Sequence, residues 1–277
     1  MNIADTVGEK IYRLRKQKGL TQEQLAKEAG VSYQAVSKWE NGAAAPDISL
    51  LPVLASIFET DIDSLLGYAA EKKTSAYYEE RYRKSGYYWG VKPSFMCFDI
   101  LKLLPPDKPL RLLDAGCGEG KDAVFFAKNG YCVSAFDITE SGVEKAKRLA
   151  GRYGADVDFF RADICDYVPD KEFDVIFCSG VLNYIPADAR SRVVENWKKH
   201  TSAGGLNAVN VFVKKPFIPD APDKERISSR WRSGELFGLY GDWRFERCEE
   251  VIFDCGSGGV PHKHCMDTLI AVKTDRI

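Results

Sequence analysis

The sequence has few histidines, few methionines and no excess of charge of either sign. Its 277 residues include three His, three Met, 39 Lys+Arg and 40 Asp+Glu, so the formal net charge is −1. The overall charge therefore does not indicate a nucleic-acid partner. No apolar run approaches the roughly 20 residues that cross a bilayer, and the opening MNIADTVGEK has no apolar signal core. We expect neither a membrane span nor a secretory leader.

Several catalytic and metal-binding patterns are also missing. The eight cysteines form no C-x-x-C pair, and a chain of this size does not need disulfide staples, so we interpret them as reduced thiols in a cytoplasmic protein. No metal site is predicted from the spacing of Cys and His. Neither a Ser/His/Asp triad nor a paired-carboxylate arrangement is evident in the sequence.

The composition itself is that of a folded protein. Apolar residues make up 45% of the chain and charged residues 29%, which excludes disordered and fibrous classes. At roughly 100–200 residues per domain, two domains are expected. We place them at residues 1–67 and 77–277, with a polar linker over 68–76.

Helical signals fill residues 1–67. Thr21 precedes Gln22-Glu23-Gln24, which is a capping box, and Gly30 is the residue type that ends a helix in the left-handed conformation. Ser32 then caps a third helix over Tyr33–Glu40, with Val36 and Trp39 on its buried side. Five short helices with one tight turn between the second and third predict a helix-turn-helix layout.

These residues resemble the lambda-repressor-like (Cro/C1, xenobiotic-response-element) DNA-binding domains. The resemblance rests on the strings TQEQLA at 21–26, GVS at 30–32 and VSKWENG at 36–42. It implies phosphate contacts from Arg15 and Gln22, and base contacts from Ser32, Tyr33, Gln34 and Lys38. It also implies a homodimer on paired half-sites of an operator. Residues 1–66 hold seven Lys/Arg against nine Asp/Glu, so a dimerisation or protein-contact module is the alternative.

The second segment alternates between strand-like and helical patterns. Alternation of this kind predicts β-α-β units and a parallel, doubly wound sheet with helices on both faces. Two later runs, Arg247–Asp254 and Thr268–Lys273, predict antiparallel edge strands. The other predicted strands cover 110–114, 132–137, 157–162, 173–179 and 206–213, and the helices cover 121–128, 141–153 and 187–200.

Polar chemistry gathers where the predicted strands end. The first strand leads into Asp114 and the glycine loop Gly116-x-Gly118-x-Gly120, which lets a ligand approach the backbone. Asp137 ends the second strand, where an acid accepts hydrogen bonds from ribose hydroxyls, and Asp163 follows the third. Any one of these acids is explained as a helix cap; the three together with the loop favour a positively charged nucleoside ligand.

This set resembles the class I S-adenosylmethionine (SAM)-dependent methyltransferases across 76–277. The resemblance implies a Rossmann-like α/β fold, SAM as the cofactor and a methyl acceptor beside Ser179 at the end of the fourth strand. The string DAGCGEGKDAVFFAKNGY at 114–131 and the segment Tyr88-Trp89-Gly90 resemble, more narrowly, the tellurite-resistance methyltransferases of the TehB type. The cofactor-binding residues implied are Tyr88, Trp89, Asp114, Gly116, Gly118, Gly120, Asp137, Ile138, Asp163, Ile164 and Ser179.

The run CGSGGVPHKHC at 255–265 holds two of the three histidines. Three interpretations stay open for this glycine-rich loop: it contacts an anionic substrate such as a chalcogen oxyanion, it binds a metal, or it is a surface turn. The first makes His262 and His264, with Arg230, the candidate substrate contacts.

Three functions compete for the whole chain. The first is a small-molecule SAM methyltransferase with an attached DNA-binding domain. The second is a transcriptional regulator whose methyltransferase-like domain senses SAM or a toxic ligand without turnover. The third, a nucleic-acid methyltransferase, lacks the N/D-P-P-Y/F motif after the fourth strand, where the sequence is SGVLNY at 179–184.

Overall fold

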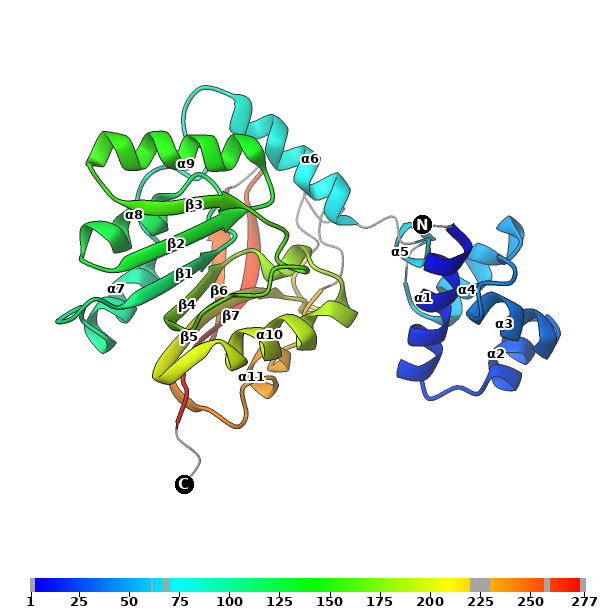
Figure 1. Cartoon of the computed structure of the whole chain (residues 1–277). Coiled ribbons are helices and arrows are strands. Elements are labelled where there is room, and N and C mark those ends of the chain that lie inside the picture. The colour runs from blue at the N-terminus through cyan, green and yellow to red at the C-terminus, as the bar shows by residue number, and fades with distance from the viewer. Residues whose placement is uncertain (1–2, 61, 67–69, 220–229, 257–259, 275–277) are drawn as a thin grey trace. The chain divides into compact units, whose positions relative to one another are not determined.

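The computed structural model describes residues 3–60, 62–66, 70–219, 230–256 and 260–274 (Figure 1). The chain forms two compact units, Met1–Lys72 and Lys73–Ile277. Each unit has its own hydrophobic core. None of the helices in the described part of the chain is long and apolar enough to cross a membrane.

The N-terminal unit is all helical. Its core gathers Val7 and Ile11 from the first helix, Leu25 from the second, and Val36 and Trp39 from the third. The elements are α1 (Ile3–Gln17), α2 (Gln22–Ala29), α3 (Tyr33–Glu40), η1 (Ile48–Leu50), α4 (Leu51–Ile57) and α5 (Ile62–Leu65).

The local signals in this unit act as the sequence predicts. The Thr21 hydroxyl accepts from the backbone N–H of Gln24 at 3.1 Å, and the Gln24 side chain accepts from the N–H of Thr21 at 2.7 Å. These two bonds satisfy amides that the first turn leaves unpaired. Gly30 closes α2 at φ +67°, and Ser32 caps α3. The predicted bounds of the third helix are confirmed.

Two helices follow that the sequence analysis did not predict. They are α6 (Ala70–Arg83) and α7 (Phe95–Leu103). The expected linker over 68–76 is therefore helical from Ala70 onward, while its first two residues lie outside the described part of the chain. Helix α7 is short and apolar nearly throughout, so its sequence carries little helical periodicity.

The second unit is built on a seven-stranded sheet of order β3-β2-β1-β4-β5-β7-β6 (Figure 1). Neighbouring strands from β3 to β5 pair in parallel, whereas β7 pairs antiparallel with both β5 and β6. The strands are β1 (Arg111–Ala115), β2 (Cys132–Asp137), β3 (Val157–Arg161), β4 (Phe173–Ser179), β5 (Thr201–Val213), β6 (Arg244–Cys255) and β7 (His262–Val272). The predicted doubly wound architecture is confirmed.

Helices cover both faces of this sheet. One core layer joins α7, α8 and α9 to the sheet, and it includes Met96, Phe126 and Leu149. The opposite layer includes Val194 and Trp197 of α10 and Leu236 of α11. The remaining elements are α8 (Lys121–Lys128), α9 (Glu140–Tyr153), η2 (Leu182–Tyr184), η3 (Ala187–Ala189), α10 (Arg190–Lys199) and α11 (Glu235–Gly238).

The C-terminal strands are longer than predicted, which corrects one sequence-based expectation. The run with His262 and His264 was expected to be an irregular loop, but both residues lie in β7, paired with β6. Pairing between strands provides hydrogen bonds for backbone amides whatever the local side chains are. Strand β7 therefore begins at His262, before the apolar run Thr268–Lys273 from which the strand was predicted. Of these two C-terminal strands, both expected at an edge, only β6 lies at an edge of the sheet, because β7 lies between β5 and β6.

Candidate functional site

The carboxyl ends of the parallel strands bring the predicted polar residues to one edge of the sheet. Asp114 lies near the end of β1, Asp137 ends β2, and Ser179 ends β4. Parallel strands that share a register end at the same side, which is where ligands bind in open α/β sheets. The site at this edge is therefore assembled from segments far apart in the chain.

Asp114 has a buried carboxylate with an unsatisfied oxygen. The residue is 2% exposed, and within the described part of the chain its Oδ2 has no hydrogen-bond partner. Burial raises its pKa well above the ordinary value, the negative charge of Asp122 adds to this, and Lys121 opposes it. A buried carboxylate oxygen without a hydrogen-bond partner is costly, and it suits a cationic ligand.

Asp137 anchors the glycine loop. Its Oδ2 accepts from the backbone N–H of Gly118 at 2.9 Å, and its Oδ1 accepts from the N–H and hydroxyl of Thr139 at 2.9 and 2.6 Å. A carboxylate has about four acceptor positions, so these three bonds leave one on Oδ2 for a ligand hydroxyl. Burial raises the pKa of Asp137, although the bonds from Thr139 and Gly118 counteract the rise.

Two glycines of the loop are held where a side chain would not fit. Gly118 has φ +54°, and a Cβ there would lie 3.0 Å from the hydroxyl of Tyr82. Gly120 has φ +86°, and its Cβ would lie 2.6 Å from the Cβ of Ala146 in α9. Both positions combine a left-handed backbone with close approach of another element, so glycine is required.

Glu119, between these glycines, is a residue that the sequence analysis missed. It is 3% exposed, and its Oε1 lies 2.8 Å from the Nζ of Lys145, itself 6% exposed. Its Oε2 accepts from the N–H of Tyr88 at 2.6 Å and of Trp89 at 3.3 Å. This carboxylate therefore ties the Tyr88-Trp89 segment to the glycine loop. One sequence signal could have indicated this buried ion pair: Lys145 lies on the apolar side of α9, among Val143, Ala146 and Leu149.

An aromatic cluster covers the loop. Tyr78 and Tyr82 of α6 are buried, whereas Tyr88 and Trp89 are 40% and 47% exposed. The Trp89 indole N–H donates to the Tyr82 hydroxyl at 3.0 Å, and the hydroxyls of Tyr78 and Tyr184 lie 2.7 Å apart. Burial and the charge of Asp137 raise the pKa of Tyr82 well above its usual value, so its hydroxyl stays neutral.

The other predicted cofactor contacts lie on the same rim. The Asp163 carboxylate accepts from the N–H of Cys165 at 2.8 Å, which closes an Asx turn after β3. Ile164 beside it is buried. The carbonyl of Ile138 accepts from the Arg161 guanidinium at 2.9 Å. Asn210 of β5 donates to the Ser179 hydroxyl at 3.3 Å and accepts from the N–H of Gly180 at 2.7 Å.

Two of the three candidate substrate contacts line one small cavity. Arg230 and His264 border a space of about 30 Å³ beyond the end of β5. Three lysines border it as well, at 214, 215 and 263. His262 does not line this cavity; its ring lies instead against that of His264. The cavity is rich in cationic side chains, which favour an anionic group.

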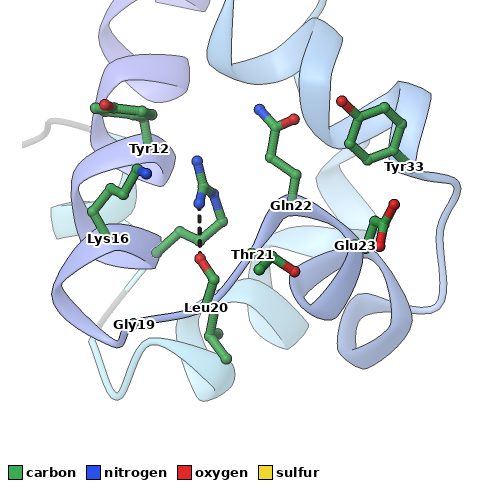
Figure 2. Close-up of a pocket in the computed structure, with 9 residues that line it drawn as sticks. Tyr12, Lys16, Gly19, Leu20, Thr21, Gln22, Glu23 and Tyr33 are labelled. Atoms are coloured by element: carbon green, nitrogen blue, oxygen red, sulfur yellow. Dashed lines mark hydrogen bonds between the residues drawn. The ribbon is translucent and has the colours of Figure 1, made fainter.

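The N-terminal unit carries an open groove between its first three helices. Figure 2 shows Tyr12 and Lys16 of α1 on one side of the groove and Gln22 and Tyr33 on the other. Beneath it, the Arg15 guanidinium forms a two-pronged ion pair with Glu40, with donor–acceptor distances of 2.5 and 2.7 Å. Gln22 donates to the same carboxylate at 2.7 Å. Arg15 is only 4% exposed, so its immediate role is to join α1 to the end of α3.

The predicted base contacts share the outer side of α3. Ser32, Tyr33, Gln34 and Lys38 are all exposed, whereas Val36 and Trp39 on the other side are buried. The Ser32 hydroxyl is already engaged, since it accepts from the N–H of Ala35 at 3.2 Å. Helix α3 and its cap therefore present four polar side chains on a face that the described residues of this unit leave exposed.

Comparison with known proteins assigns a domain type to each unit. A model of methyltransferase domains matches residues 112–205, and a model of helix-turn-helix domains matches residues 11–65. The chain is 24% identical over 185 residues to a probable S-adenosyl-L-methionine-dependent methyltransferase TehB of Haemophilus influenzae, covering 67% of this chain and 60% of that protein.

Solved structures share the fold of the second unit. The crystal structure of TehB from Haemophilus influenzae matches with a TM-score of 0.59 and 21% identity, over 73% of this chain and 67% of that one. A magnesium protoporphyrin IX methyltransferase of Synechocystis, crystallised with SAM, matches with a TM-score of 0.54 and 17% identity, over 74% and 97%. The chain spans about half to three-fifths of the length of its first curated relatives.

Proposed function

We propose that this chain, which joins a helix-turn-helix domain to a methyltransferase domain, transfers a methyl group from SAM to a small molecule. One observation carries the proposal. The unsatisfied carboxylate oxygen of Asp114 lies beside a glycine loop, at the ligand-binding edge of a sheet of order 3-2-1-4-5-7-6. SAM fits this site chemically, because it carries cationic groups for Asp114 and ribose hydroxyls for the remaining acceptor position of Asp137.

The protein's contribution to such a reaction is binding, alignment and exclusion of water. When bound, SAM supplies a methyl group on a positively charged sulfur, and that charge disperses as the methyl group moves. Asp114 and the glycine loop then hold the donor, and Asp137 orients its ribose. Tyr82 and Trp89 cover the loop and limit access of water. The reaction needs no strong acid or base at the donor.

The acceptor we propose is small and anionic. The support is the cavity shared by Arg230 and His264, with its lysine-rich lining beyond the end of β5. Chalcogen oxyanions such as tellurite and selenite are the first acceptors to test, in view of the TehB-type sequence pattern. The transferred methyl group would be followed with radiolabelled SAM, and turnover of any acceptor would exclude a domain that only senses its ligand.

We expect Asp137→Ala to bind S-adenosylhomocysteine at least about tenfold more weakly than the wild type, a loss of about 1.4 kcal/mol or more. The substitution removes an acceptor for ribose and releases the N–H of Gly118. Calorimetric titration of the full chain measures the effect. Asp158→Ala, an exposed acid on the neighbouring strand β3, is the control and should bind as the wild type does. Unchanged binding by Asp137→Ala would contradict the assigned site.

We further propose that the N-terminal domain binds an operator as a homodimer in the cytoplasm. The exposed side chains of α3 support this, since Gln34 is able to pair with adenine and Lys38 with guanine. We expect Gln34→Ala to weaken binding to the preferred sequence by about 1–3 kcal/mol with little effect on random DNA. Electrophoretic shifts with selected DNA measure this, and Lys27→Ala on the exposed side of α2 is the control. Equal losses on both DNAs, or a solution mass of one chain, would contradict the proposal.

A further inference from the structure

Three side chains with metal-binding atoms meet at the end of the β6–β7 hairpin. Cys255 ends β6 and is paired across the strands with His262, and His264 lies two residues further along β7. Residues two apart on a strand face the same side, so the three side chains share one face. Their ligand atoms, one sulfur and two imidazole nitrogens, all lie within 4.8 Å of one another.

The two imidazole rings meet through their Nε2 atoms. These atoms lie 2.9 Å apart, within hydrogen-bond distance, and the rings are nearly perpendicular at 88°. The Nδ1 of His262 lies 2.7 Å from the carbonyl of Val260, and a carbonyl only accepts, so this nitrogen carries the proton. In the neutral ring the Nε2 of His262 is then unprotonated and directs its lone pair toward His264. Histidines that bind metals usually donate their other ring N–H to such an acceptor, which fixes the orientation of the ring.

Aromatic packing holds the ring of His264 in this orientation. The ring of His264 stacks on Phe212 of β5, with centroids 4.5 Å apart and planes 22° apart. Lys263 lies between the histidines in sequence and borders the cavity that His264 lines. Its ammonium forms an ion pair with Asp254 at 2.6 Å.

We propose that Cys255, His262 and His264 bind a divalent transition-metal ion of the zinc type. One thiolate and two imidazoles suit such an ion, whereas magnesium and calcium prefer oxygen ligands. Zinc bonds of about 2.0–2.1 Å to nitrogen and 2.3 Å to sulfur place tetrahedral ligands roughly 3.3–3.6 Å apart. The two Nε2 atoms, 2.9 Å apart, would have to separate by a few tenths of an ångström, and the thiol, within 4.8 Å of them, would have to move inward.

The cluster lies next to the cavity that we propose for the methyl acceptor. Cys265 of β7 pairs with Val213, the last residue of β5, so the cluster lies at the edge of the sheet where the parallel strands end. His264 also lines the lysine-rich cavity. Three protein ligands leave the fourth tetrahedral position open, as in zinc sites that bind water or substrate. The metal-binding assignment itself does not depend on methyl transfer.

The test is a metal titration of the full chain without an affinity tag, after chelator treatment under reducing conditions. We expect one equivalent of Co²⁺ to bind with a tetrahedral visible spectrum and a thiolate-to-cobalt charge-transfer band. We expect zinc to displace it, as followed with a chromophoric chelator. His262→Ala and His264→Ala should lower the zinc affinity at least about tenfold. Cys255→Asp should keep a ligand for cobalt and lose only the thiolate band.

Two matched controls separate this site from general binding to thiols and imidazoles. His200→Ala removes the third histidine of the chain, and Cys248→Ser removes an exposed thiol on the same strand β6; both should bind like the wild type. Far-ultraviolet circular dichroism checks the fold of every variant. Absence of stoichiometric binding by the wild type, or a thiolate band that persists in folded Cys255→Asp, would overturn the proposal.

Discussion

Asp114→Asn is expected to change the pH dependence of stability and to weaken SAM binding at the same time. In the folded protein, burial raises the pKa of Asp114 well above its value in the unfolded chain. The folded state therefore binds this proton more tightly, and the contribution of Asp114 to stability falls as pH rises between the two pKa values. The slope is up to about 1.4 kcal/mol per pH unit.

Thermal unfolding of the ligand-free full chain across pH 4–8 measures the first effect. The wild type should lose stability relative to Asp114→Asn as pH increases, because asparagine has no proton to lose. Asp158→Ala again provides the comparison, since it removes an exposed carboxylate. A wild type and an Asp114→Asn variant with parallel pH profiles would show that Asp114 has an ordinary pKa.

The second effect concerns the ligand. A cation beside Asp114 stabilises the ionised carboxylate, so at pH values where the free protein holds this proton, SAM binding should release it and should strengthen as pH rises. Calorimetry in buffers of different ionisation enthalpy detects that proton. We expect Asp114→Asn to bind SAM about 30-fold or more weakly, since losing one partner of a buried charge pair costs about 2–5 kcal/mol, and to release no proton. Equal proton release by both proteins would place the cation elsewhere.

Glu119→Ala is expected to destabilise the methyltransferase domain by about 3–5 kcal/mol, because it leaves the ammonium of Lys145 buried without its carboxylate. Two further donors, the N–H groups of Tyr88 and Trp89, lose their acceptor. Such a loss is a large fraction of the stability of a typical domain. Urea unfolding of the full chain, followed by tryptophan fluorescence, measures it.

Two comparisons identify the cause of this loss. Glu144→Ala breaks the exposed ion pair between Glu144 and Lys147 on α9, the helix that carries Lys145. This substitution should lower the stability by less than about 1 kcal/mol. The double variant Glu119→Leu, Lys145→Met removes both buried charges and should recover much of the loss. A single variant as stable as Glu144→Ala would mean that the buried pair contributes nothing. Glu119→Gln, which keeps an acceptor oxygen for Tyr88, should bind SAM more tightly than Glu119→Ala.

Much of the fold was predictable because its signals are local. The capping box at Thr21, the glycine at 30 and the serine cap at 32 each act within one turn of helix, and the third helix has the predicted bounds. The strand-and-helix alternation likewise indicated the parallel sheet, with β2 and β4 placed at the expected residues. Where pairing partners decide the ends, as for β5 and β7, the sequence analysis made the strands too short.

The residues of the candidate site were also predictable where their signals are local, and their contacts were not. The glycine loop and the acids at the strand ends were visible, because each stands at a fixed offset from an apolar run. The partners of these acids were not visible: Asp137 meets Gly118, 19 residues away, and Glu119 meets Lys145, 26 residues away. The aromatic cluster over the loop also depends on where α6 packs.

The sequence by itself determined a helical domain, an α/β domain, the glycine loop and the acid-bearing strand ends, since these follow from composition, periodicity and spacing along the chain. Only the tertiary structure decided which charges are paired and which are not. In the described part of the chain the Oδ2 of Asp114 has no hydrogen-bond partner, whereas the Arg15 guanidinium is paired with Glu40. The structure alone also brings Cys255 to His262 and His264, although the alternation His-Lys-His was a sequence signal for one face of a strand. Strand pairing sets that contact, because it places residues side by side whatever their separation in the chain.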